Sequence, residues 1–274
     1  MKNIIIPVFM LVYILQLFFS LLISFFLSYF NLFSINNGYK EIIIDFNIIL
    51  FFIFLIFAAL IINFTLTFFN KINKRKLNIY MKNMRFNFFS KNNINLCLSI
   101  IVVHILYTIL YADIKFNNIL IQSFLLAFIF FMASAFWEEF IFRGFYFYIT
   151  ARSLYKSKIN FLFFIFFQAL IFSIVHINNP NLNFTHLLNI FLGGIFLGLL
   201  AFENFKLSVI FHFFWNFIQS VIFGLSVSSH QFKEKLFVSK NIHEWEKNIF
   251  TSAIFVAAIL YQIRNNLKNE KYIK

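Results

Sequence analysis

Charged side chains are scarce in this sequence. Of its 274 residues only 12% are charged and 61% are hydrophobic, a composition that a soluble domain of this length does not have. Cysteine is almost absent as well, because Cys97 is the single one, and this excludes an intrachain disulfide. The lack of charge therefore predicts a protein that crosses a membrane several times.

The hydrophobic residues gather in eight runs that are compatible with membrane-crossing helices. The runs cover residues 4–30, 42–69, 96–112, 119 to about 148, 159–177, 186–202, 207–225 and 248–263. The first run is too long for a signal peptide and no small-residue cleavage site follows it, so we expect it to be a span. We predict an all-α, polytopic membrane protein with about eight transmembrane helices in one bundle around a buried polar cavity. Residues 1–274 would form a single transmembrane domain, with a functional core at residues 119–225.

Basic residues set the expected orientation of this bundle. The most basic connection follows the second run and has no acidic residue; it contains Lys71, Lys74, Arg75, Lys76, Lys82, Arg85 and Lys91. The positive-inside rule places this connection and both termini in the cytoplasm. Contact with anionic lipid headgroups explains the charge better than binding to nucleic acid does. In the sixth run Gly194 and Gly198 are four residues apart, which predicts a close approach of another helix.

Three ionisable side chains interrupt the fourth run. Glu138, Glu139 and Arg143 lie among apolar residues, where each would cost roughly 2.5–3.5 kcal/mol if it faced lipid. Glu139 and Arg143 are four residues apart in the favourable order for a helical ion pair. Glu138 lies about 100° further round the helix, so we expect it to stay available for chemistry in a wet, protein-lined cavity.

Two later runs carry polar residues at helical spacing. Phe172 and His176 are four apart, and so are His212 and Asn216, which places each pair on one face of its helix. A lone histidine in a span is more often a structural hydrogen bonder, and we expect that of His104, with a capping or interfacial role for His186. In combination with Glu138, however, two imidazoles and a carboxamide provide a base, a proton shuttle and oxyanion donors for the attack of water on an amide.

These three motifs, in this order on successive runs, resemble those of an intramembrane protease family. It contains the Ras-converting type of CAAX prenyl endopeptidase and the bacterial proteins for bacteriocin processing and self-immunity, also called the CPBP or Abi family. The resemblance implies hydrolysis of a peptide bond in a membrane-associated or lipidated protein, in a multi-pass protein of a bacterial cell membrane. It also implies roles for the residues of the motifs: Glu138 and His176 would activate water, and His212 and Asn216 would hold the oxyanion, with Glu139 and Arg143 as their buried ion pair.

Other catalytic chemistries find few of their residues in this chain. There is no His-Glu-x-x-His motif and no Gly-x-Ser-x-Gly motif, and Asp45 and Asp113 are the only aspartates, so the usual zinc, serine and paired-aspartate sites are absent. We expect no cofactor. A zinc ion held by Glu138, His176 and His212 stays open as an alternative. Two other functions also stay open: a proteolytically silent adaptor or immunity factor of the same fold, and a proton-coupled transporter, which the lack of an inverted repeat disfavours.

One difficulty concerns the depth of His176 in the membrane. It ends its apolar run, so a helix that crossed the bilayer fully would carry His176 to the face opposite Glu138. The two can share one water only if the fifth helix stops partway across, with residues 178–183 lining a wet cavity as irregular backbone. We therefore predict that the Glu138 carboxylate and the His176 ring lie much closer than about 10 Å.

Overall fold

The computed structural model describes residues 33–36, 39–42, 91–117, 121–145, 158–177, 179, 182–225, 230–232, 235–240 and 245–268. The first two predicted spans lie outside these residues, apart from Ile42. The basic connection also lies outside them except for Lys91, and so does the stretch at residues 146–157. The predicted number of eight spans and the orientation of the termini therefore remain predictions.

The described part is mostly helical, as the sequence predicts. Its α-helices are α3 (Lys91–Tyr111), α4 (Ile121–Glu139), α6 (Lys158–Val175), α7 (Phe184–Phe217) and α8 (Ile249–Lys268). There are also three shorter helices in the described part. The π-helix η1 (Phe140–Phe145) follows α4, the π-helix η2 (Ile218–Ile222) follows α7, and the 3-10 helix η3 (Trp245–Lys247) precedes α8. Each helix falls on or beside one of the hydrophobic runs, because an apolar helix satisfies its own backbone groups wherever water is excluded.

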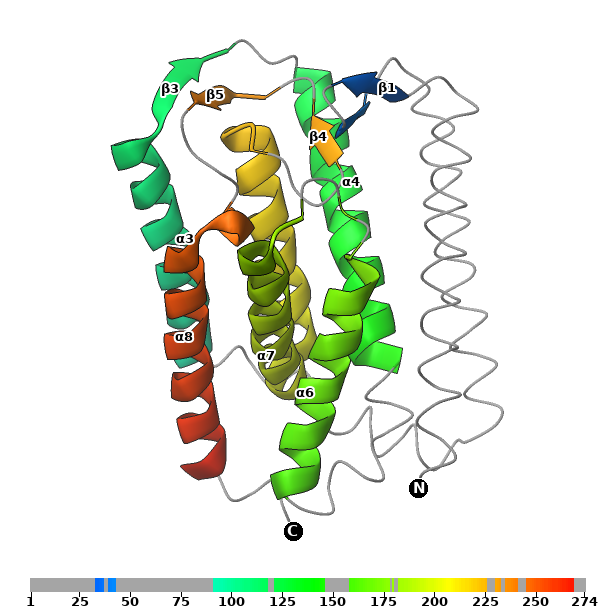
Figure 1. The fold of residues 1–274 in the computed structure, drawn as a ribbon, viewed down its shortest axis with the longest axis vertical. Coiled ribbons are helices and arrows are strands. Elements are labelled where there is room, and N and C mark those ends of the chain that lie inside the picture. Colours follow the sequence, from blue (N-terminus) through cyan, green and yellow to red (C-terminus); the bar gives the residue numbers. More distant parts are fainter. Residues whose placement is uncertain are drawn as a thin grey trace.

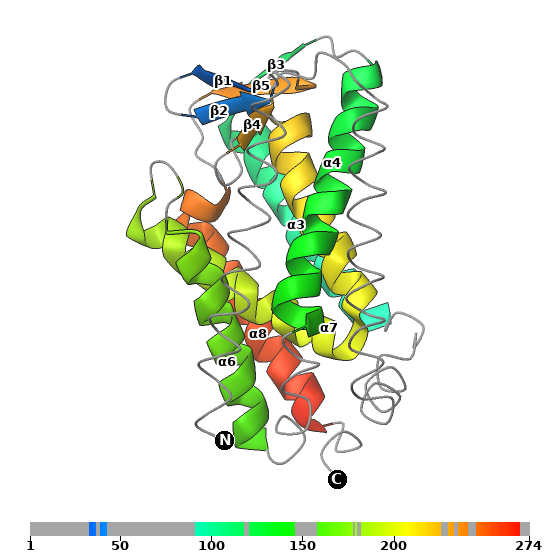
Figure 2. The same ribbon diagram turned by 90° about the vertical axis from the view of Figure 1, so that its right-hand side faces the viewer.

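Helix α7 contains the sixth and seventh predicted spans as two segments joined at Asn204. The backbone of Asn204 is extended, with φ −155° and ψ 101°, and its side-chain oxygen accepts a hydrogen bond from the amide of Leu207 at 3.2 Å. The chain reverses direction there (Figure 2), and the hydroxyl of Ser208 reaches back to the carbonyl of Leu197 at 3.1 Å. The tight connection predicted between the two runs is therefore a polar turn that caps the second segment.

Helix α7 lies at the centre of the bundle and packs against α3, α4, α6 and α8 (Figure 1). The close approach predicted at Gly194 and Gly198 is confirmed. A Cβ atom added at Gly194 would lie 3.1 Å from the Cβ of Ala169 in α6, and one at Gly198 would lie 2.6 Å from the amide nitrogen of Gln168. These two glycines let the backbones of α6 and α7 approach more closely than any larger residue would allow.

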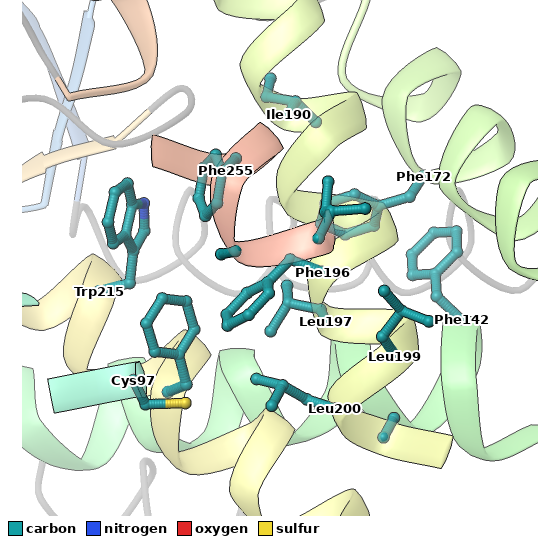
Figure 3. Close-up of a cluster of buried hydrophobic side chains, with 14 of the residues drawn as sticks. Cys97, Phe142, Phe172, Ile190, Phe196, Leu197, Leu199, Leu200, Trp215 and Phe255 are labelled. Carbon is teal, nitrogen blue, oxygen red and sulfur yellow. The ribbon is translucent and has the colours of Figure 1, made fainter. Parts of the chain in front are cut away.

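Aromatic side chains fill much of the space between the helices. Phe196 and Trp215 from the two segments of α7 meet Phe255 from α8, and Phe172 of α6 lies on the other side of this cluster (Figure 3). The rings of Trp215 and Phe255 are 5.3 Å apart. This packing fixes the positions of the two segments of α7 relative to α6 and α8, and the polar groups of the site sit on those same helices.

Five short strands were not expected from the sequence. Strands β1 (Phe33–Asn36), β2 (Tyr39–Ile42) and β4 (His230–Phe232) form one sheet, and β3 (Asp113–Phe116) pairs with β5 (Phe237–Lys240) in another. They gather at one end of the bundle (Figure 1). Backbone groups in the connections between helices need partners, and pairing with another connection supplies them. The prediction of an all-α fold is therefore right for the bundle and incomplete for these connections.

Two described helices are long and apolar enough to cross a membrane, namely residues 91–111 and 184–222. Shorter apolar helices cover residues 161–175 and 249–264. Large hydrophobic side chains lie on the outside of the bundle, and on α3 the side chain of Leu110 is 74% exposed.

Candidate active site

Glu139 is the most enclosed acidic group of the site. It ends α4, its side chain is fully buried, and three donors reach its carboxylate from two helices. Arg143 in η1 donates to Oε1 at 2.8 Å, His212 in α7 donates to the same oxygen at 2.9 Å, and the hydroxyl of Ser208 donates to Oε2. The ion pair that the spacing predicted is present, and the carboxylate also orients a histidine.

Arg143 has its charge balanced inside the protein. Besides Glu139, its guanidinium contacts the carbonyl of Gly194 at 3.3 Å and lies over the ring of Phe172 at 4.2 Å from the ring centre. It belongs to η1, a π-helical stretch, and such stretches are rare and often occur at functional sites. A cation stacked on an aromatic ring and paired with a carboxylate is stable without water, so Arg143 is a structural part of the site.

Glu138, in contrast, is partly open. Its side chain is 18% exposed, and the hydroxyl of Ser134 donates a hydrogen bond to Oε1 at 3.3 Å. The other oxygen, Oε2, faces two imidazoles, with the Nε2 atoms of His212 at 3.8 Å and His176 at 4.0 Å. The available carboxylate is thus the one that the sequence predicted, and both histidines lie just beyond direct hydrogen-bond distance from it.

The contacts of His176 determine which of its ring nitrogens carries the proton. Its Nδ1 lies 2.6 Å from the carbonyl oxygen of Phe172, and a carbonyl can only accept, so Nδ1 is the donor. In the neutral ring, Nε2 is then an acceptor, and it is this atom that points to Glu138. The predicted proximity of His176 and Glu138 agrees with the structure, because α6 ends at Val175, next to the site.

His212 has the same arrangement with a stronger partner. Its Nδ1 donates to the Glu139 carboxylate, which fixes the ring and directs Nε2 toward Glu138. A carboxylate behind an imidazole is the usual device for holding a histidine in one tautomer. The two glutamates therefore lie on opposite sides of the His212 ring, with Glu139 at Nδ1 and Glu138 near Nε2.

These groups open onto a cavity of about 50 Å³. A cavity needs a volume of only about 10–15 Å³ to hold one water molecule, so this cavity can hold water beside the Glu138 carboxylate. Its lining contains Glu138, Phe172, His176, Asn189, Ile190, Gly193, Leu197, Phe211, His212, Trp215, Asn216, Glu246 and Phe255. The structure thus brings together Glu138, His176, His212 and Asn216 from three different helices, and Glu139 and Arg143 lie directly behind them.

A comparison with protein families supports the resemblance that the motifs suggested. The family described as Type II CAAX prenyl endopeptidase Rce1-like matches residues 120–218, about a third of the chain. This part of the chain is therefore similar to CAAX-type endopeptidases. The match includes all seven residues of the three motifs. No curated protein and no solved structure matches the chain.

Sequence reasoning missed several residues of this site. Ser208 could have been found, because it precedes His212 by four residues and so continues the face of His212 and Asn216. Asn189 and Glu246 gave no such signal. Asn189 lies alone in an apolar run, and Glu246 lies outside the family match, in a connection of mixed charge.

His104 has the structural contacts that were expected of it, whereas the cap of the helix at His186 is the side chain of Asn183. His104 is buried, with Nδ1 at 2.7 Å from the carbonyl of Ile100 and Nε2 at 3.0 Å from the hydroxyl of Thr251 in α8. His186 lies in the first turn of α7, where its amide donates to the capping side chain of Asn183 at 2.7 Å. Neither histidine lines the cavity of the site.

The zinc alternative finds no ready-made ligand set. Among the residues that the structure describes, no group of three or more His, Cys, Asp or Glu side chains is arranged to hold a metal ion. The family match does not address a metal, so metal dependence is left to experiment.

Proposed function

We propose that this protein is an intramembrane endopeptidase that hydrolyses a peptide bond by means of water activated by Glu138 and His176. One observation carries the proposal: the Oε2 atom of Glu138 and the Nε2 atom of His176 are 4.0 Å apart across a cavity that has room for water. Both atoms are acceptors in the arrangement described above. One water between them can donate to both, and each of those hydrogen bonds would have ordinary length.

The chemical step follows from this geometry. The water transfers a proton to the Glu138 carboxylate, and its oxygen forms a bond to the carbonyl carbon of the peptide. The carbonyl π electrons move to the oxygen, and when they return the carbon–nitrogen bond breaks. The proton held by Glu138 then passes to the departing nitrogen, so that one carboxylic acid and one amine are formed from one peptide bond and one water.

The oxyanion of this step would be held by His212 and Asn216. Asn216 lines the same cavity as Glu138 and carries two N–H donors. His212 donates from Nε2 when it is an imidazolium, and the Glu139 carboxylate at Nδ1 would balance that positive charge. Donors fixed in place before the reaction typically contribute a factor of about 10² to 10³ each.

The expected substrate is a peptide segment of a membrane-associated or lipidated protein. This follows from the family match and from the apolar outer faces of the helices, which suit contact with lipid. We propose accordingly that the chain is a multi-pass protein of a cell membrane, with about eight spans and both termini in the cytoplasm. Prenylated substrates are one class within this proposal, and the chain has no cue that selects them.

A cleavage assay tests the proposal directly. The full-length protein in detergent or nanodiscs is incubated with a library of lipidated and transmembrane peptides in H₂¹⁸O, and products are identified by mass spectrometry. We expect defined products with one ¹⁸O atom in the new carboxyl group. His176→Ala should lose cleavage and should still fold, since the hydrogen bond of its side chain is to Phe172 one helical turn away and the rest of the ring borders the cavity.

The same assay separates the alternatives. A silent adaptor or a transporter would yield no product that depends on His176, and either result would overturn the proposal. A chelator such as 1,10-phenanthroline should leave cleavage unaffected. Loss of activity with chelator and recovery with zinc would replace the glutamate mechanism with a metal-dependent one.

A further inference from the structure

Glu246 is a buried acid that the proposed mechanism does not use. It lies in η3 and is 9% exposed. One oxygen, Oε1, accepts hydrogen bonds from the Trp215 indole at 2.7 Å and the Gln219 amide at 3.2 Å. The other oxygen, Oε2, has no hydrogen-bond partner among the described residues. A buried carboxylate with half of its acceptor capacity unfilled is costly, so this group calls for a partner.

The position of this carboxylate is firmly fixed. The amide of Trp245 donates to Gln219 at 2.9 Å, and the side chain of Asn189 donates to the Glu246 carbonyl at 2.8 Å. The hydroxyl of Ser252 in turn donates to Asn189 at 2.7 Å. Residues of α7, η2, η3 and α8 together therefore hold Glu246 at the cavity of the site.

The cavity that Glu246 lines is negatively charged and aromatic. Glu138 is on its wall and Glu139 lies behind it, and Arg143 is the cation paired with Glu139. None of the described residues on the wall is a lysine or an arginine. When ionised, Glu138, Glu139 and Glu246 carry three negative charges, and Arg143 and a protonated His212 carry two positive ones. One negative charge then lacks a counterpart, and a cation from outside the protein would supply it.

Aromatic rings complete the surroundings of such a cation. Phe172, Phe211, Trp215 and Phe255 all line the cavity, and Figure 3 shows the rings of Trp215 and Phe255 beside one another. Aromatic faces attract cations, and tryptophan does so most strongly. A carboxylate oxygen without a partner and a wall of rings are two separate features that favour the same kind of ligand.

We propose that Glu246 is a specificity-determining residue that binds a primary ammonium group of the substrate, namely a lysine side chain near the scissile bond. This inference rests on the proposed peptidase function and deepens it. The cavity of about 50 Å³ suits an ammonium, which is about the size of a water molecule, better than a guanidinium. Burial raises the pKa of the Glu246 carboxyl, so part of the gain from a bound cation is used to ionise it.

The test measures binding and needs no turnover. Full-length His176→Ala protein, which is inactive but keeps all three carboxylates, is titrated in nanodiscs with fluorescent hydrophobic peptides of about 20 residues. Each peptide carries one lysine, moved along the sequence, and is matched with a peptide that has norleucine at the same position. At one position the lysine peptide should bind roughly 10-fold to 100-fold more tightly, the range of a hydrogen bond to a charged group. A ratio near one at every position would overturn the inference.

Variants then assign the preference to Glu246. In the same background, Glu246→Gln keeps an acceptor oxygen for Trp215 and Gln219 but removes the charge, and it should bring the lysine to norleucine ratio close to one. Glu203→Gln is the matched control, because Glu203 bonds to Asn93 and does not line the cavity; it should keep the ratio of the parent. A ratio that survives Glu246→Gln would refute the assignment.

The outcome is separate from that of the proposed function. If the wild-type protein cleaves no peptide, the peptidase proposal fails, whatever the ratio is. If it cleaves lysine and norleucine peptides equally well and binds them equally, the peptidase stands and the ammonium site is refuted. The comparison of peptides in the His176→Ala protein is decisive even if Glu246→Gln does not fold.

Discussion

Replacement of Glu139 by leucine gives the sharpest test of how the two glutamates divide their roles. The Glu139 carboxylate is fully buried and accepts from Arg143, His212 and Ser208. Leucine is similar in size but accepts nothing, so the guanidinium of Arg143 would keep only the carbonyl of Gly194 at 3.3 Å and its stacking on a ring. The change therefore leaves a buried charge without its counterion.

The magnitude follows from the burial of both partners. Removal of one partner of a buried ion pair typically costs about 3–5 kcal/mol, which is a large part of a total stability of about 5–15 kcal/mol. Arg143→Met should cost a similar amount of stability, because it would leave the Glu139 carboxylate buried without its cation. The double variant Glu139→Leu, Arg143→Met leaves no unpaired charge, so it should be destabilised by clearly less than the sum of the two single variants.

Unfolding by SDS titration in mixed micelles, together with the cleavage assay, measures both effects. We expect the double variant to recover much of the stability of the wild type but to remain inactive, because His212 has lost the acceptor that orients its ring. Leu110→Ala, at a 74% exposed position, is the control and should change neither property. A Glu139→Leu protein as stable as the wild type would refute the reasoning, because Arg143 would then not depend on this carboxylate.

Three further predictions concern single side chains. Glu138→Gln should lower the rate of cleavage by about 10² to 10⁴, the usual contribution of a general base, with unfolding in SDS unchanged; retained activity would contradict the mechanism. Ser208→Ala should destabilise the protein by about 1.5–3 kcal/mol, the value of a hydrogen bond to a charged group such as Glu139, and unfolding at the wild-type SDS concentration would argue against that bond. Gly194→Val should destabilise it by about 1–3 kcal/mol through overpacking, because a Cβ there would already lie 3.1 Å from Ala169, whereas unchanged stability would mean that α6 can move away.

Some features of the site could be predicted because they are local. The pairing of Glu139 with Arg143 needs only the helical repeat, which places residues four apart on one face. The same repeat turns Glu138 away from that pair and toward the cavity. The expectation that all three lie inside the bundle needs only the high cost of a charge in an apolar medium. The structure agrees on each of these points.

Other features depend on where helices end and on what packs beside them. The distance between Glu138 and His176 follows from the end of α6 at Val175 and from the close contact of α6 with α7 at Gly194. Hydrophobicity alone would have continued the run to Ile177. The sequence could therefore raise the question of depth, and only the packing of helices brought the two groups together.

The sequence by itself determined the helical architecture of the described part and the identities of the seven motif residues, because both depend on composition and on a spacing of four residues. Only the tertiary structure decided that Glu139 also holds His212, and that Glu246 reaches the same cavity from η3. Glu246 is 70 or more residues from Glu138 and His176 and lies outside the family match. It belongs to a connection with both acidic and basic residues, where a glutamate does not stand out. Contacts between groups so far apart in the chain arise from the packing of α7 against η3 and α8, and no local pattern in the sequence encodes them.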